Sequence, residues 1–265
     1  MRTPHPVKPG ILLLCVSLLL WCLTSCGTMS TAKAKPPRYV SPYNWQQLVQ
    51  DDNGRFSYLH GNTVKSRFGI DVSEHQGAID WQAVANDGVE FALIRLGNRG
   101  ATEGLLYLDD YFEDNISGAQ QAGILVGVYF FSQAITEAEA REEAEFVLKH
   151  LKGHRLDYPV VFDHEKVFGM EARSDHLTGE QISRCTETFL EIIREAGYDT
   201  MVYGNKSDLY RLSPYLLNRY GVWLAEYDAA HPTMEHDLAI WQFTSNGSVD
   251  GISTRTDLNI HFIAP

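Results

Sequence analysis

Short apolar runs alternate with stretches of helical spacing along the chain from residue 66 onward. A short apolar run rich in β-branched and aromatic residues predicts a buried strand, whereas apolar positions three and four apart predict a helix packed by one face. The predicted strands are residues 68–72, 91–96, 124–131, 158–162, 200–203, 222–225 and 239–241, with a last strand near Asp257. The predicted helices are residues 81–87, 109–122, 137–151 and 179–196.

This alternation predicts an α/β fold, with the strands closed into a parallel, TIM-like β/α barrel. The connections at residues 226–238 and 243–256 are short for full crossover helices. We therefore expect an irregular barrel with reduced outer helices in its C-terminal part.

The first residues follow a different pattern. Arg2 and Lys8 precede an apolar run over residues 11–23, which small residues follow. This is the layout of a signal peptide, and the run is shorter than the roughly 20 residues that a membrane-spanning helix needs. Residues 23–26, with the sequence Leu-Thr-Ser-Cys, resemble the lipobox of bacterial lipoproteins. We expect an exported lipoprotein anchored to the membrane through Cys26; the alternative is a secreted protein.

Four parts follow from these patterns. Residues 1–25 are the expected lipoprotein signal peptide, and residues 26–42 the lipidated cysteine and a flexible tether. Residues 43–66 form a lead-in, and residues 67–265 form the barrel domain. Removal of the signal and use of Cys26 would leave only Cys185, which we expect to be a buried apolar residue.

The charge balance restricts the class of partner. The composition is that of a globular protein, and the formal net charge is -12. Such an acidic chain is a poor nucleic-acid binder. It is also poorly suited to electrostatic capture by an anionic polymer, so polymer recognition should depend on local groove chemistry.

Carboxylates follow several predicted strands. Asp71 ends the first strand, Asp163 and Glu165 end the fourth, and Asp257 ends the last. In a parallel barrel the active site lies at the carboxyl ends of the strands. Side chains alternate along a strand, so Asp163 and Glu165 should share one face while His164 points the other way.

Two acids on one wall suit a particular chemistry. Their repulsion would raise the pKa of at least one carboxyl and keep it protonated, as glycoside cleavage requires of its acid. The same acids could instead cap helices, pair with surface cations, serve another hydrolase or hold a divalent metal. No His-Glu-x-x-His spacing occurs, and we expect no catalytic metal.

Several motifs carry a more specific signal. Residues 69–81, with the sequence GIDVSEHQGAIDW, resemble the opening signature of glycoside hydrolase family 25, the family of Chalaropsis-type and phage lysozymes. Further similar motifs are FALIR at 91–95, GVYFF at 127–131, VFDHE at 161–165, WLAEY at 223–227, IWQFTS at 240–245, GSVDGI at 247–252 and DLN at 257–259. The resemblance spans residues 67–265.

This resemblance implies a lysozyme that hydrolyses the β-1,4 bond between N-acetylmuramic acid and N-acetylglucosamine, without a metal or organic cofactor. Glu165 matches the proton donor of the family, and Asp163 matches the acid that stabilises the substrate or acts as base. Asp71 and Asp257 match the two other acids of the pocket. The expected partner is peptidoglycan, with roles in its catabolism and in cell-wall remodelling, and the expected state is a monomer.

Aromatic residues complete the expected groove, because the apolar faces of sugars stack on flat side chains, although each aromatic taken singly is as often a core residue. The candidate substrate contacts are Tyr129, Tyr203, Trp223, Tyr227, Trp241, Gln242 and Arg95. Two positions depart from the family pattern. His164 replaces an aliphatic residue, for which we expect a structural hydrogen bond, and Asn98 stands where an aromatic residue is common.

Two other functions remain open at this stage. A peptidoglycan-binding protein could keep the groove without turnover, although retention of all four acids disfavours it. A related hydrolase could prefer chitin-type, β-1,4-linked N-acetylglucosamine.

Overall fold

The computed structural model of the chain describes residues 38–167 and 169–263. The predicted signal peptide at residues 1–25 and the predicted lipid anchor at Cys26 lie outside the described residues, as does the predicted tether up to residue 37. None of the helices formed by the described residues is long and apolar enough to cross a bilayer.

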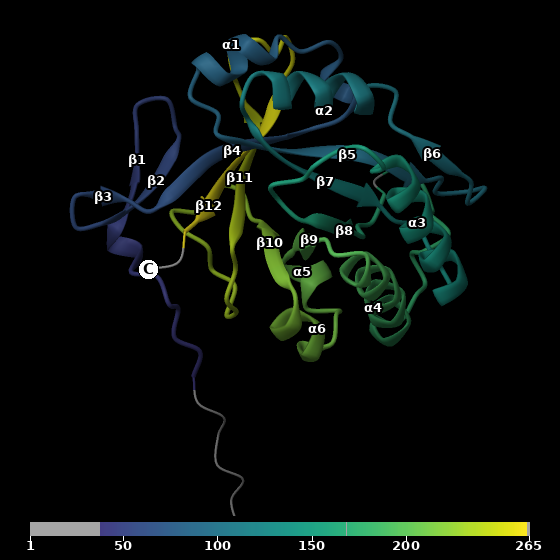
Figure 1. Ribbon diagram of the computed structural model, residues 1–265. Helices are drawn as coiled ribbons and strands as arrows, with labels where there is room; N and C mark the ends of the chain where they lie inside the picture. The colour runs from purple at the N-terminus through teal and green to yellow at the C-terminus, as the bar shows by residue number, and fades with distance from the viewer. Residues whose placement is uncertain (1–37, 168, 264–265) are drawn as a thin grey trace, which may run out of the picture. The chain divides into compact units, whose positions relative to one another are not determined.

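Eight strands close into a barrel, because β4 pairs with β5 on one side and with β12 on the other (Figure 1). All eight correspond to strands that the hydrophobic pattern predicts. Their bounds are β4 (Ser66–Val72), β5 (Phe91–Arg99), β7 (Leu125–Phe131), β8 (Val160–Asp163), β9 (Thr200–Asn205), β10 (Gly221–Ala225), β11 (Ile240–Gly247) and β12 (Thr256–Phe262). A short additional strand, β6 (Leu106–Leu108), pairs with the end of β5.

The direction of the last strand corrects the sequence expectation of a wholly parallel barrel. β12 runs antiparallel to both of its neighbours, β11 and β4. Residues 248–255, which connect β11 to β12, contain no helix, and a parallel return needs a crossover of a dozen or more residues, whereas an antiparallel return needs only a short loop. β12 therefore begins at the edge of the barrel where the parallel strands end.

Helices cover only part of the barrel, as the short C-terminal connections predict. α2, α3 and α4 lie outside β5, β7 and β8 (Figure 1), whereas residues 226–239 and 248–255 form no helix. The capping box of Thr178 and Gln181 fixes the start of α4. The helices are α1 (Trp81–Asn86), α2 (Phe112–Gln121), α3 (Glu137–His150), α4 (Gly179–Glu195), α5 (Lys206–Leu209) and α6 (Pro214–Arg219), with 3-10 turns η1 (Trp45–Gln47) and η2 (Glu74–Gln76).

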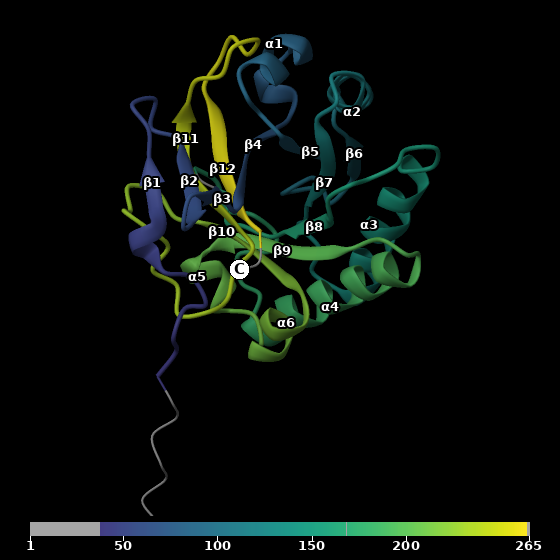
Figure 2. The same cartoon turned by 60° about the vertical axis from the view of Figure 1, so that its left-hand side comes forward.

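The segment predicted as a lead-in forms a small sheet of its own. Its strands are β1 (Leu48–Gln50), β2 (Phe56–His60) and β3 (Thr63–Val64). This sheet flanks β11 and β12, where the barrel has no helix (Figure 2). Phe56 packs against Trp241 and Phe243, with ring centroids 4.9 and 5.1 Å apart. The lead-in thus covers apolar barrel surface that an outer helix would otherwise bury.

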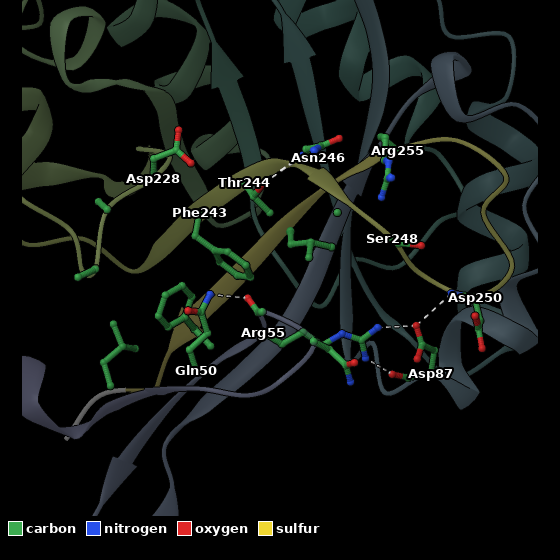
Figure 3. A pocket seen from close by; sticks show the side chains of 18 residues that line it. Gln50, Arg55, Asp87, Asp228, Phe243, Thr244, Asn246, Ser248, Asp250 and Arg255 are labelled. Carbon is green, nitrogen blue, oxygen red and sulfur yellow. Dashed lines mark hydrogen bonds and ion pairs between the residues drawn. The ribbon is translucent and has the colours of Figure 1, made fainter.

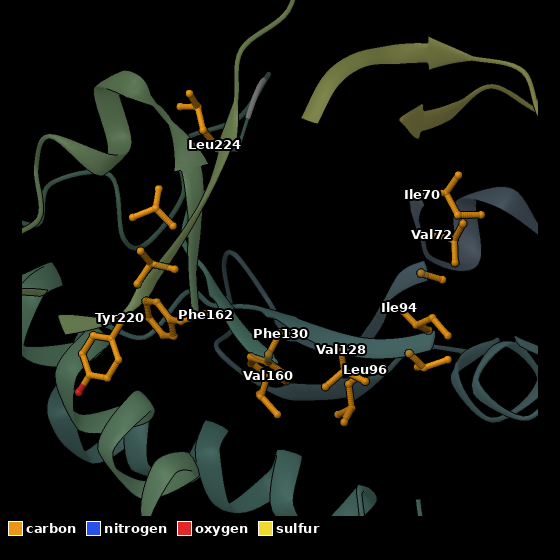
Figure 4. Close-up of a cluster of buried hydrophobic side chains, with 14 of the residues drawn as sticks. Ile70, Val72, Ile94, Leu96, Val128, Phe130, Val160, Phe162, Tyr220 and Leu224 are labelled. Atoms are coloured by element: carbon orange, nitrogen blue, oxygen red, sulfur yellow. The ribbon is translucent and has the colours of Figure 1, made fainter. Parts of the chain in front are cut away.

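Two apolar layers follow from the alternation of side chains along the strands. The inner layer fills the barrel and consists of Phe91, Leu93, Tyr158, Val161, Met201, Tyr203, Trp223, Ala225 and Ile240. The outer layer, which includes Ile94, Val128 and Phe162, lies between the strands and the helices (Figure 4). Each such buried side chain stabilises the fold by about 1.5–3 kcal/mol. Cys185 is buried in the outer layer and forms no disulfide.

Candidate active site

The four predicted acids meet in one cavity of about 270 Å³ at the mouth of the barrel. Asp71 and Asp163 lie at the ends of β4 and β8, and Glu165 follows β8 by two residues. Asp257 lies at the start of β12, directly opposite Asp71 in the pairing of these strands. It shares the mouth with the other acids because β12 is antiparallel, and not, as predicted, because it ends a parallel strand. The cavity is lined by Asp71, Arg95, Tyr129, Phe131, Asp163, Glu165, Tyr203, Trp223, Tyr227, Gln242 and Asp257.

Of the four acids, Asp71 accepts the most side-chain hydrogen bonds. Its Oδ2 accepts hydrogen bonds from the side-chain amides of Gln242 at 2.8 Å and Asn259 at 2.7 Å. Burial raises the pKa of Asp71 well above its usual value, the charge of Asp257 raises it further, and the two amide bonds oppose the rise. The carboxyl of Asp71 is therefore held in one orientation by neutral donors.

Asp163 and Glu165 lie on the same wall of the cavity, as strand alternation predicts. The Oδ1 atom of Asp163 is buried and has no hydrogen-bond partner among the described residues. Burial raises the pKa of Asp163 well above its usual value, and the charges of Glu165 and Asp71 add to the rise. Burial, followed by the charges of Asp208 and Asp257, raises the pKa of Glu165 to about 7.

The cavity lacks a compensating cation. Among the described residues, no lysine or arginine lies within ion-pair distance of the four carboxyls. Arg95 lines the cavity, but its guanidinium pairs with Asp109 at 2.7 Å and with Glu74 at 2.8 Å. Burial also raises the pKa of Asp257 to about 6. Near neutral pH, ionising all four acids at once would therefore be energetically unfavourable. At least one carboxyl stays protonated while others are ionised.

Hydroxyl and indole groups fix the two amides that hold Asp71. Tyr203 and Tyr227 donate to Oε1 of Gln242 at 2.8 and 2.6 Å, so the Gln242 amide must point its NH2 group at Asp71. Trp223 Nε1 donates to Oδ1 of Asn259 at 2.8 Å. The aromatic residues of the cavity thus orient the polar network as well as offering ring surface.

The predicted substrate contact of Trp241 is wrong, because its side chain does not line the cavity. Trp241 is fully buried in the outer layer, where its Nε1 donates to the carbonyl of Glu226 at 2.8 Å. The reason is strand alternation: Gln242 points into the barrel, so its neighbour Trp241 must point out. The remaining predicted contacts, Tyr129, Tyr203, Trp223, Tyr227, Gln242 and Arg95, line the cavity.

Sequence reasoning also missed two residues of the site, and the expectation for His164 is met at most by one of its two ring nitrogens. Asn259 follows Asp257 by two residues, so alternation alone places it on the same face. Phe131 follows Tyr129 in the same way and lines the cavity. The structural hydrogen bond expected of His164 is not found for its Nε2, which is buried without a partner among the described residues. Burial lowers the pKa of His164 to about 4, so this ring is neutral.

A larger hollow lies elsewhere on the molecule. A groove of about 870 Å³ lies between the β1–β2 turn and the outer side of β11 and β12 (Figure 3), and none of the four acids lines it. Its charges include the Arg55–Asp87 ion pair, with an N–O distance of 2.6 Å. Among residues 38–167 and 169–263 there is also no cluster of His, Cys, Asp and Glu side chains arranged to hold a metal ion.

Comparisons with known proteins agree with this geometry. The chain is 30% identical over 191 residues to the autolytic lysozyme of Clostridium acetobutylicum; the match covers 72% of this chain and 54% of the relative, so the chain spans about half the length of that protein. It resembles a bacterial lysozyme from Streptomyces coelicolor, with a TM-score of 0.63 and 26% identity, over 73% of this chain and 90% of that structure.

A third similar structure is the modular autolysin LytC from Streptococcus pneumoniae in complex with a synthetic peptidoglycan ligand. The TM-score is 0.65 and the identity 26%, over 80% of this chain and 51% of that chain. The family model of the glycosyl hydrolases family 25 matches residues 70–252, which include Asp71, Asp163 and Glu165. The barrel with its acid-lined mouth and this match lead to one conclusion: the chain belongs to the glycosyl hydrolases family 25.

Proposed function

We propose that this protein is a muramidase, which hydrolyses the β-1,4 bond between N-acetylmuramic acid and N-acetylglucosamine in peptidoglycan. The observation that carries the proposal is the wall formed by the buried Asp163 and the partly buried Glu165, neither of which forms an ion pair with a lysine or arginine among the described residues. The likeness to an autolytic lysozyme, and to an autolysin crystallised with a peptidoglycan ligand, supports the substrate class.

Glu165 is the proton donor in this proposal. With its pKa at about 7, a large share of the molecules carry a protonated Glu165 near neutral pH. Its proton passes to the glycosidic oxygen as the bond from that oxygen to the anomeric carbon breaks. Asp163 stabilises the positive charge that develops on the sugar, and water then adds to the anomeric carbon and returns a proton to Glu165.

Asp71 and Asp257 have supporting roles. The amides of Gln242 and Asn259 hold Asp71 toward the substrate, where its carboxyl can accept a hydrogen bond from a sugar hydroxyl or acetamido N–H group. Asp257 keeps the proton on Glu165, because its charge raises the pKa of that acid. Tyr129, Tyr203 and Tyr227 offer ring faces and hydroxyls to the sugars.

Analysis of the new reducing ends tests the reaction. Purified peptidoglycan is digested with the full chain in detergent and with Glu165→Gln, then reduced with borohydride and analysed by mass spectrometry. We expect muramitol ends that depend on Glu165. Glucosaminitol ends, or faster cleavage of chitin oligosaccharides, would assign a different linkage, and binding without any release would leave a peptidoglycan-binding protein.

We also propose that the protein is a lipoprotein anchored through Cys26 at the cell envelope. Two hydrogen bonds tie the start of the described chain to the barrel: Tyr39 donates to Asp237 at 3.0 Å, and Tyr43 donates to the carbonyl of Leu238 at 3.2 Å. Both acceptors directly precede β11, at the edge opposite the catalytic mouth. Cys26 precedes Tyr39 by 13 residues, which reach at most about 45 Å when extended. An anchor at Cys26 would thus leave the mouth free to face the wall.

Metabolic labelling with an alkyne fatty acid tests this anchor. We expect the full chain to be labelled and to remain with the membranes, and Cys26→Ser to lose both properties. Cys185→Ser is the matched control, because Cys185 is buried within the barrel domain. Label retained by Cys26→Ser would refute the anchor, and a soluble wild-type protein would favour secretion.

A further inference from the structure

The proposed acid lies beyond the strand that should hold it. β8 ends at Asp163, and its last paired residue on β7 is Phe131. One more bond extends this ladder, from the backbone N–H of Ser132 to the carbonyl of Asp163 at 2.7 Å. Beyond that point β7 has ended, and the pairing of β8 with β9 also stops at Asp163, so neither neighbouring strand pairs with the backbone of Glu165.

Beyond the end of β8, the side chain of Gln133 forms a hydrogen bond with the backbone of Glu165. The amide of Gln133 donates from Nε2 to the main-chain carbonyl of Glu165 at 3.2 Å. The Oε1 of the same amide accepts from the hydroxyl of Ser174 at 2.7 Å. A carbonyl oxygen can only accept, so the NH2 group of Gln133 must face Glu165, and the Ser174 hydroxyl then satisfies the other end of the amide.

The surroundings of Gln133 leave it little freedom. Its side chain and that of Ser174 are buried, with 0% and 1% exposure. Arg173 donates to the Gln133 carbonyl at 3.3 Å and forms an ion pair with Glu139 on α3 at 2.7 Å. Arg173 and Ser174, both in the segment after Glu165, therefore hold Gln133, and the ion pair of Arg173 ties that segment to α3. Gln133 itself does not line the cavity.

We propose that Gln133 is a positioning residue for Glu165: its side-chain amide replaces the missing strand pairing and fixes the backbone that carries the proposed acid. A buried amide with both ends satisfied has one stable orientation, so the Glu165 carbonyl is held at a defined point. Catalysis by a general acid is sensitive to misplacement of about 1 Å. The inference rests on the proposed function for its kinetic consequence, but its structural part can be tested without any turnover.

Gln133→Met in the full chain is the main test, because methionine keeps the length of the side chain and loses the amide. Gln120→Met is the matched control: Gln120 on α2 also donates a side-chain amide to a main-chain carbonyl, that of Arg155, at 2.7 Å. We expect kcat of Gln133→Met to fall about 10- to 100-fold with KM changed less than about threefold. Both kinetic constants of Gln120→Met should stay near those of the wild type.

Carbon NMR titration of labelled glutamate carboxyls gives the second readout, with Glu165→Gln identifying the signal. In Gln133→Met the pKa of Glu165 should lie below that of the wild type, because a released carboxyl gains contact with water. Ser174→Ala should give smaller changes in the same directions, which keeps the test usable if Gln133→Met does not fold.

The two readouts separate the possible failures. An unchanged Glu165 titration, together with wild-type kcat in Gln133→Met or Ser174→Ala, would overturn the positioning role. An inactive wild type would overturn the proposed function instead, and the titration would still decide whether Gln133 fixes Glu165.

Discussion

The two polar hollows of the molecule differ in how their charges are balanced. In the outer groove, Arg55 binds Asp87 through both its carboxylate and its backbone carbonyl, and Asp87 also accepts from the backbone N–H of Asp250 (Figure 3). Although partial burial opposes the change, these hydrogen bonds lower the pKa of Asp87. In the cavity of the four acids, Arg95 pairs with Asp109 and Glu74 instead, so none of the four forms an ion pair with a lysine or arginine among the described residues, and burial raises the pKa of Glu165 to about 7.

The difference shows that size alone does not identify a reactive site. The groove is about 870 Å³ and the cavity about 270 Å³, yet only the cavity keeps acids poised to exchange protons near neutral pH. A paired acid such as Asp87 contributes to stability, whereas an unpaired buried acid reduces stability and gains reactivity.

The largest expected effect comes from the same kind of substitution in the two hollows. Glu165→Gln should lower kcat about 100- to 10,000-fold, because the proposed proton donor is lost. Asp87→Asn should leave kcat near that of the wild type and lower the free energy of unfolding by about 1–2 kcal/mol, because a half-buried ion pair is broken. Peptidoglycan digestion and urea unfolding at neutral pH measure the two effects.

Loss of activity in a folded Asp87→Asn variant would contradict this distinction between the groove and the cavity. The groove would then belong to the catalytic machinery.

Asp257→Asn should have an intermediate effect, visible in the pH profile. The charge of Asp257 raises the pKa of Glu165, so its removal lowers that pKa. An acid catalyst must be protonated, and activity is lost as the pH rises through its pKa. The alkaline limb of kcat should therefore move to lower pH, with the greatest loss of activity above neutral pH. A limb at the wild-type position would mean that Asp257 does not act on Glu165 through its charge.

The smallest effects concern stability, and they should have opposite pH dependence in the two hollows. The folded pKa of Glu165 is raised from 4.5 to about 7, so its contribution to stability is fully present below the unfolded pKa and is lost as the pH rises through the folded pKa. Glu165→Gln should thus melt above the wild type at pH 8 and near it at pH 4.

The contribution of Asp87 to stability has the opposite pH dependence. Its folded pKa is lowered, so its contribution is present above the unfolded pKa and is lost as the pH falls through the folded value. Asp87→Asn should melt below the wild type at pH 7 and approach it in acid. Thermal melts of the three proteins across this range measure both effects, and equal trends in the two variants would contradict the comparison.

Much of the catalytic wall was predictable because it depends on one local rule. Strand alternation predicts Asp163 and Glu165 on one wall, and both line the cavity although β8 ends at Asp163. The same rule also forbids Trp241 and Gln242 from both pointing inward, so the error at Trp241 was avoidable from the sequence. It likewise places Asn259 on the face of Asp257.

Hydrophobic periodicity and short-range spacing are local properties of the chain, and they suffice to predict the eight barrel strands, the reduced C-terminal helices and the family motifs. The direction of β12 and the contact between Gln133 and Glu165 became visible only in the folded structure. β12 pairs with β4, the first strand of the barrel, and the Gln133 contact joins residues 32 positions apart in the chain. Neither a strand pairing nor a long-range hydrogen bond leaves a periodic trace in the residues that form it.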